Sequence, residues 1–105
     1  MADSNQPEVE LRPFHDARVL WPPDMPDDML EDAVETAKEA MKKFDIESKG
    51  QEVAKMIKQH FDEKWDLYWH VTIGKSFGSH ATHEARRFVY FYLDKYAFMI
   101  YKIGY

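Results

Sequence analysis

The stretch Phe88-Val-Tyr-Phe-Tyr-Leu93 decides the fold of this chain. It consists of aromatic and aliphatic residues, a composition that favours a β-strand. Side chains alternate between the two faces of a strand, so this stretch presents two sets of residues. One set is Phe88, Tyr90 and Tyr92, and the other is Val89, Phe91 and Leu93. Because both sets are apolar, both faces of the sheet that contains this strand must be covered.

Further strands are predicted around this stretch. The four segments after Leu67 that are rich in β-branched and aromatic residues are 69–73, 76–82, 87–93 and 96–103. Asp94-Lys95 makes a short connection between the last two, and residues 96–103 are also apolar on both faces. A shorter strand is expected at residues 18–21, where Pro22-Pro23 ends it.

Two amphipathic helices are predicted before these strands. Over residues 24–44 apolar side chains recur with helical spacing, and Lys42 and Lys43 stand near the end, where the helix dipole favours them. The apolar positions are Met29, Leu30, Ala33, Val34, Ala37, Ala40, Met41 and Phe44. A second helix is expected to begin near residues 48–51, where Ser-x-x-Gln matches a capping box, and to reach about Lys64. Its apolar stripe is Val53, Ala54, Ile57 and Phe61.

These elements predict an α+β fold in which two N-terminal helices pack on an antiparallel sheet. The helices cover one face of the sheet, and a second copy of the chain is the simplest cover for the other. We expect one domain over residues 18–105, preceded by a disordered tail over residues 1–17, which are polar and aperiodic.

Composition excludes several classes of function. The 105 residues contain no cysteine, which excludes thiolate nucleophiles and thiolate metal sites. The net charge of −5 comes with no basic stripe, so we expect no binding to nucleic acid. No segment approaches the roughly 20 apolar residues of a membrane helix, so the protein is expected to be soluble and intracellular.

The polar run of residues 74–84 carries side chains that suggest chemistry, but their spacing argues against it. Gly74-Lys75-Ser76 ends like a phosphate-binding loop, yet Trp69 occupies the position where that loop needs glycine. In a strand, His80 and His83 point to opposite faces, which disfavours a shared metal. The run also lacks the Gly-x-Ser-x-Gly elbow of serine hydrolases. We therefore expect no enzymatic activity, no metal and no cofactor, and keep a metal-binding or hydrolytic role of His80 and His83 as the less favoured alternative.

The same run suits the addition of a foreign strand. Over residues 76–82 its side chains are mostly small, and it contains neither proline nor a charged residue. Small side chains let another backbone approach, and exposed main-chain groups offer it a hydrogen-bonding ladder. The alternative from the residues alone is an internal strand with no binding role.

These segments closely resemble the eight-kilodalton dynein light chain family, in its dimeric hub class. The resemblance covers roughly residues 18–104. It rests on Trp69-His70, residues 74–79, Thr82-His83-Glu84 and residues 88–93, together with Asp24-Met25, Met29 and Phe44-Asp45-Ile46-Glu47.

The resemblance implies a symmetric homodimer in which residues 76–82 cross over and join the partner's sheet. Two identical grooves result, and each binds a short disordered segment with a Thr-Gln-Thr-like core as an added strand. The peptide-binding residues implied are Glu47, Lys49, Phe77, Gly78, Ser79, His80, Ala81, Thr82, His83, Tyr90 and Tyr92. The dimer-interface residues implied are His70, Ser76, Gly78, His80 and Thr82. The expected partners include a dynein intermediate chain, and the expected location is the cytoplasm and cytoskeleton.

Three departures from the family pattern affect these expectations. His80 stands where the family usually has tyrosine, so we expect a dimer that is more sensitive to acid. Ile103 aligns with a serine whose phosphorylation breaks the family's dimer, so that switch is expected to be absent. The segment Ser48-Lys49-Gly50 is longer than usual where the second helix opens. The longer segment and His80 support an alternative, a divergent light chain with altered ligand preference in a specialised cytoskeletal or targeting role.

Overall fold

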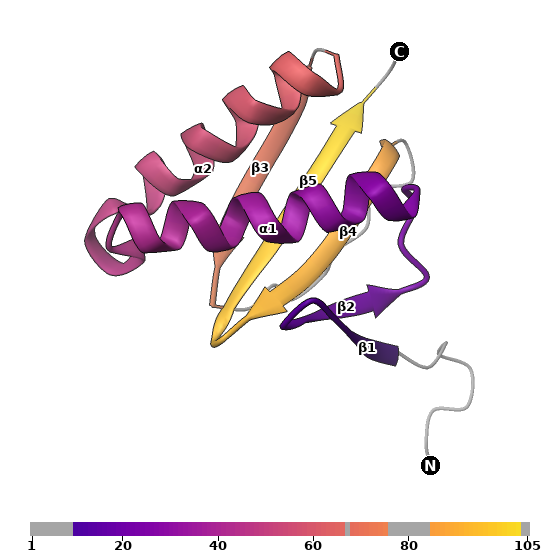
Figure 1. Ribbon diagram of the computed structural model, residues 1–105, viewed down its shortest axis with the longest axis horizontal. Coiled ribbons are helices and arrows are strands. Elements are labelled where there is room, and N and C mark those ends of the chain that lie inside the picture. The colour runs from indigo at the N-terminus through magenta and orange to yellow at the C-terminus, as the bar shows by residue number, and fades with distance from the viewer. Residues whose placement is uncertain (1–9, 67, 76–84, 104–105) are drawn as a thin grey trace.

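The computed structural model describes residues 10–66, 68–75 and 85–103 (Figure 1). Along the chain its elements are β1 (Glu10–Phe14), β2 (Ala17–Trp21), α1 (Asp27–Lys43), α2 (Ile46–Lys64), β3 (Trp69–Gly74), β4 (Ala85–Leu93) and β5 (Tyr96–Ile103). The strands form one antiparallel sheet in the order β1-β2-β4-β5-β3. The predicted α+β fold of two helices on an antiparallel sheet is therefore confirmed.

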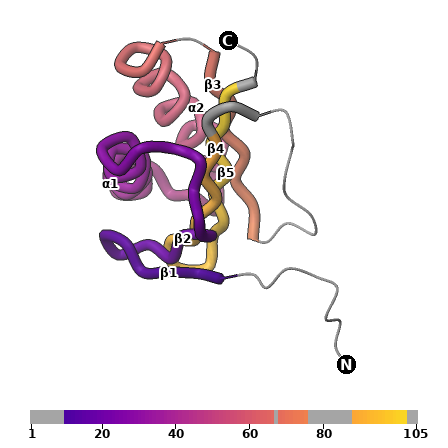
Figure 2. Tube along the Cα trace, turned by 90° about the vertical axis from the view of Figure 1, so that its right-hand side faces the viewer, coloured from indigo at the N-terminus to yellow at the C-terminus, as the bar shows by residue number. Residues whose placement is uncertain are grey.

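Both helices lie on the same side of the sheet (Figure 2). Val89, Phe91 and Leu93 of β4 are buried beneath them. Phe88, Tyr90 and Tyr92 of β4 point to the opposite face, and no helix of the described residues lies on that side. The two-layer arrangement follows from the two helical apolar stripes, each of which is buried against one sheet face.

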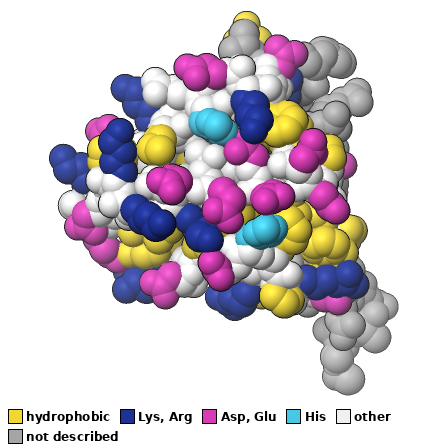
Figure 3. Space-filling view, viewed as in Figure 1, with side chains coloured by type: hydrophobic (Ala, Val, Ile, Leu, Met, Phe, Trp, Pro, Cys, Tyr) yellow, Lys and Arg dark blue, Asp and Glu magenta, His cyan; other side chains and the backbone are white. Residues whose placement is uncertain are grey.

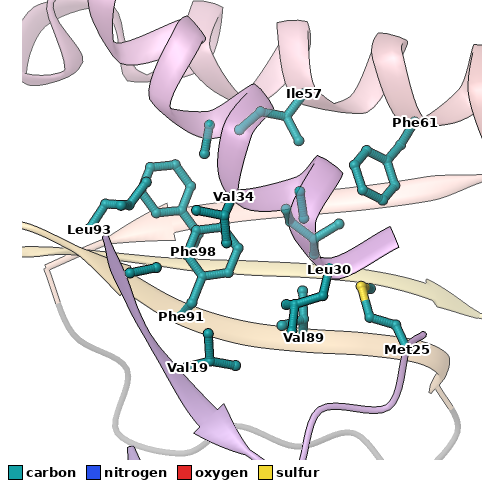
Figure 4. Close-up of a cluster of buried hydrophobic side chains, with 14 of the residues drawn as sticks. Val19, Met25, Leu30, Val34, Ile57, Phe61, Val89, Phe91, Leu93 and Phe98 are labelled. Carbon is teal, nitrogen blue, oxygen red and sulfur yellow. The ribbon is translucent and has the colours of Figure 1, made fainter. Parts of the chain in front are cut away.

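The core fills the space between the helices and the sheet (Figure 4). Val34 from α1, Ile57 from α2 and Val19 from β2 are fully buried there. The rings of Phe91 and Phe98 stack with centroids 5.3 Å apart and an interplanar angle of 9°. Complete burial of such a side chain stabilises the fold by about 1.5–3 kcal/mol.

Helix α1 forms within the predicted range of residues 24–44 but begins at Asp27, and the backbone of Asp24 pairs with that of Phe88 in β4 instead. The buried members of its predicted stripe are Met29, Leu30, Ala33, Val34, Ala37 and Ala40, whereas Met41 and Phe44 are partly buried and pack against the same core. Asp27 and Asp28 lie in its first turn and Lys42 and Lys43 in its last. Charged side chains of both signs cover the exposed helical face of the molecule (Figure 3). This distribution is that of an amphipathic helix on a solvated surface.

The predicted start of the second helix is wrong. Helix α2 begins at Ile46, and its N-cap is Asp45, whose Oδ1 accepts a 3.3 Å hydrogen bond from the backbone N–H of Glu47. Ser48 lies in the first turn and donates its hydroxyl to Asp45 Oδ2 at 3.0 Å, so it does not start the helix. Lys49 then departs from helical geometry, with φ −127° and ψ 36°, which separates the first turn from the rest. The cap is thus Asp45, three residues before the Ser-x-x-Gln pattern from which the start was predicted.

The predicted disordered tail is wrong for residues 10–16. Residues 10–14 form β1, which pairs with all five residues of β2. His15 and Asp16 form the tight turn with positive φ values of 50° and 74°. Asp16 Oδ2 accepts a 2.7 Å hydrogen bond from Lys38 of α1, which lowers the pKa of Asp16 and raises that of Lys38. Main-chain pairing holds this strand, so its side-chain pattern carries little signal. Residues 1–9 lie outside the described residues.

Candidate binding groove

A groove of about 730 Å³ lies between the start of α2 and strand β3. The first turns of α2 form one wall, and residues 71–75 form the other. Tyr96, the first residue of β5, also lines it. The lining includes Glu47, Glu52, Lys49 and Lys75, so both signs of charge are present in equal number.

Strand β3 forms the end of the sheet beside this groove. It pairs with β5 through six residue pairs, from Trp69↔Lys102 to Gly74↔Ala97. No strand of the described residues pairs with its other edge. An unpaired edge presents backbone N–H and C=O groups that a further strand can satisfy. The site can therefore accept an added strand.

The sheet face away from the helices is aromatic and apolar. Register places residues from three strands in rows across it, because residues directly opposite each other share a face. One row is His70, Tyr101 and Phe88, and the next is Thr72, Met99 and Tyr90. The rings of His70 and Tyr101 stack with centroids 5.2 Å apart. The hydroxyl oxygens of Tyr90 and Tyr92 are 3.3 Å apart, and Arg18 lies 5.0 Å from the Tyr92 ring.

The structure brings together only part of the predicted peptide-binding set. Glu47 and Lys49 line the groove, and the carboxylate of Glu47 is 3.8 Å from Lys95 Nζ. Tyr90 and Tyr92 lie in β4, which β5 separates from β3, so they are not among the residues that line this groove. His70, predicted at a dimer interface, is exposed on the aromatic face.

The remaining predicted site residues lie outside the described residues. They are Ser76, Phe77, Gly78, Ser79, His80, Ala81, Thr82 and His83. Their roles stay predictions.

Sequence reasoning missed Tyr96, Val71 and Ile73 as groove residues. All three were assigned to strands, but strand assignment does not show which side of β3 faces the start of α2. The signal that could have found Tyr96 is its period of two with Phe98, which places it on the helix-covered face.

The described residues contain no group of three or more His, Cys, Asp or Glu side chains that could hold a metal ion. Among them, too, no helix is long and apolar enough to cross a membrane.

Two helices on one face of an antiparallel sheet, with a groove beside a free strand edge, define an α+β domain of the two-layer class. Residues 17–103 match the family of dynein light chain type 1, and the chain belongs to this family. The match begins at the first residue of β2, so β1 and its turn precede the family's domain. Family membership supports a light chain of non-catalytic type.

Two solved structures share the fold. Both are of the dynein light chain-like domain of the Fasciola hepatica calcium binding protein FhCaBP2. A mercury derivative has a TM-score of 0.73 at 20% identity, over 88% of this chain and 96% of that one. A native crystal form has a TM-score of 0.69 at 17% identity, over 99% of each chain. At these identities the likeness is one of fold.

Proposed function

We propose that this chain is a non-catalytic, dimeric light chain that binds short linear motifs by β-strand addition. The observation that carries the proposal is the unpaired edge of β3 beside the 730 Å³ groove. A free sheet edge beside a groove suits a ligand that binds as an added strand, because its main-chain groups can pair with those of the edge.

The second part of the proposal is a homodimer. Residues 76–82 of one copy would be the first strand added to the free edge of β3 of the other copy. A peptide with a Thr-Gln-Thr-like core would then pair with the outer edge of that crossed strand and lie between it and α2. The aromatic face supports this, because His70 on it is exposed, Met99 and Tyr101 are partly exposed, and an accessible patch of this composition is typical of an interface. Two grooves on one dimer would hold two partner chains together and raise their apparent affinity through effective concentration.

The proposed partners are a dynein intermediate chain and other proteins with short motifs, in the cytoplasm and on the cytoskeleton. Calorimetry with a Thr-Gln-Thr peptide, run beside a zinc titration and sedimentation analysis, tests the proposal. We expect a dimer that binds two peptides and takes up no stoichiometric zinc. Zinc uptake without peptide binding would instead favour a metal role for His80 and His83.

A divergent light chain with altered ligand preference is the second candidate. The observation that favours it is the irregular start of α2, where Lys49 is non-helical within the segment Ser48–Gly50 that lines the groove. A stable dimer that binds no Thr-Gln-Thr peptide would support this candidate over the first.

A further inference from the structure

The hydroxyl of Tyr96 is buried without a hydrogen-bond partner among the residues that the structure describes. The residue is only 7% exposed, and its ring belongs to the hydrophobic core cluster. A buried hydroxyl normally finds a partner, because leaving it unpaired costs the free energy of its lost hydration. An unpaired hydroxyl in native protein therefore requires an explanation.

The position of Tyr96 beside the groove explains the unpaired hydroxyl. Tyr96 lines the same groove as the first turns of α2, so the unpaired hydroxyl belongs to a residue at the candidate binding site. The adjoining wall is loosely built: Lys49 is non-helical, and a Cβ placed on Gly50 would meet no atom within 4 Å. A segment bound in the groove would lie against Tyr96, and the open space at Gly50 leaves this turn room to adjust to it.

The charges around the groove restrict the chemistry of a group that could pair with this hydroxyl. Glu47 is 3.8 Å from Lys95, whose Nζ in turn lies 5.8 Å from the centre of the Tyr96 ring. Glu52, Lys49 and Lys75 add one acidic and two basic side chains to the lining. With Glu47 the lining is balanced, so no uncompensated charge is available for a buried carboxylate or ammonium group.

A phenol hydroxyl both donates and accepts hydrogen bonds, and so does a side-chain carboxamide. We propose that Tyr96 is a specificity-determining residue whose Oη hydrogen-bonds an uncharged amide side chain of the bound segment. This inference rests on the proposed function, and it adds a side chain of β5 to the residues at the start of α2 that the family resemblance assigns to the ligand. Tyr96 would favour an amide over an apolar side chain of equal length, because only the amide satisfies the hydroxyl.

The test compares the wild-type chain with Tyr96→Phe, which keeps the ring and removes the hydroxyl. Calorimetry would use a peptide with a Thr-Gln-Thr core and the same peptide with Met in place of Gln. We expect the wild type to prefer the Gln peptide by about tenfold, the factor expected for one satisfied buried hydrogen bond. Tyr96→Phe should lose most of this preference, because its affinity for the Gln peptide falls while its affinity for the Met peptide stays the same. Tyr68→Phe is the matched control, because Tyr68 is 66% exposed.

Thermal unfolding of the unliganded proteins provides a second readout. Tyr96→Phe should unfold at the same temperature as the wild type or higher, because it removes an unpaired polar group. A lower unfolding temperature would mean that the hydroxyl already has a partner, and would overturn the inference. Unchanged discrimination between the two peptides would overturn it while the proposed function stood. Failure of the wild type to bind either peptide would refute the proposed binding of this motif, and this inference with it.

Discussion

The backbone N–H of Trp69 donates a 2.9 Å hydrogen bond to Oδ1 of Asp62. This bond joins the last turns of α2 to the first residue of β3, the two elements between which the groove lies. The other carboxylate oxygen of Asp62 accepts a 2.6 Å hydrogen bond from Lys58 Nζ, one helical turn earlier. Asp62 therefore fixes the far end of β3 against the helix that faces it.

The pKa of Asp62 makes this connection sensitive to acid. Burial raises the pKa, but hydrogen bonds from Lys58 and Trp69 and the nearby Lys58 and His70 charges lower it more, so it lies below the ordinary value. A depressed carboxyl pKa adds stability that is complete above the unfolded-state pKa and is lost as pH falls through the folded-state pKa. We expect Asp62→Asn to lower the free energy of unfolding by about 1–2 kcal/mol at pH 7. The difference should shrink below about pH 4, near the unfolded-state pKa of aspartate.

Denaturant unfolding at pH 7 and pH 3 measures both effects. Glu63→Gln is the matched control, since Glu63 is exposed on the neighbouring position of α2. If Asp62→Asn lowers the free energy of unfolding by the same amount at the two pH values, the assigned role of the carboxylate is contradicted.

The helices and the core could be predicted from sequence because their signal is periodic. Buried residues such as Ala33 and Phe61 recur with the helical period, and the helix-covered residues of β4 recur with a period of two. The start of α2 and strand β1 could not, because α2 begins at a single side-chain cap and β1 is held by main-chain pairing, and neither leaves a periodic pattern in the sequence. Asp45 caps α2 through one side chain, and Asp16 secures the β1–β2 turn through Lys38, 22 residues away.

The residues of the candidate site also fall into those that the sequence predicts and those that it does not. Glu47 and Lys49 were found through resemblance to a family, which transfers positions along the chain. The period of two that Tyr96 shares with Phe98 places Tyr96 on the helix-covered face, but only the tertiary structure shows that the start of α2 lies beside it and makes it a groove residue. Local patterns thus predict the scaffold, and tertiary packing decides which side chains line the groove.

The carboxylate of Asp32 connects the two helices on their outer side. Its Oδ2 accepts hydrogen bonds from Trp65 Nε1 at 2.7 Å and pairs with His60 Nε2 at 2.8 Å. The Asp32 side chain is only 16% exposed, so loss of this acceptor leaves the indole N–H partly buried and unpaired. We expect Asp32→Ala to lower the free energy of unfolding by about 1–3 kcal/mol, measured by urea denaturation. Glu39→Ala on the exposed face of α1 is the control, and a loss of the same size there would refute a specific role for Asp32.

Gly50 lies in α2 at a position where the structure has room for a side chain. A Cβ added there meets no atom within 4 Å, so alanine fits without displacing a neighbour. Because alanine restricts the unfolded chain more than glycine does, we expect Gly50→Ala to raise the free energy of unfolding by about 0.4–1 kcal/mol. Thermal denaturation of Gly50→Ala beside the reverse change Ala54→Gly, in the same helix, checks this. A destabilised Gly50→Ala would show that the first turn of α2 needs the freedom of glycine.

Phe98 and Met99 are neighbours in β5 that face opposite sides of the sheet. Phe98 is fully buried beneath the helices, whereas Met99 is partly exposed in the row with Thr72 and Tyr90. Phe98→Ala should lower the free energy of unfolding by about 3–5 kcal/mol, because it leaves a cavity in the core. Met99→Lys should leave the fold intact and weaken self-association, because a charge would have to be buried at the proposed dimer face.

Circular dichroism and sedimentation velocity, run over the same range of protein concentration, separate the two outcomes for these variants. Native circular dichroism for Met99→Lys together with a shift from dimer to monomer is the expected result. If Met99→Lys associates as the wild type does, the second copy of the chain does not cover this face, and the proposed dimer must form elsewhere.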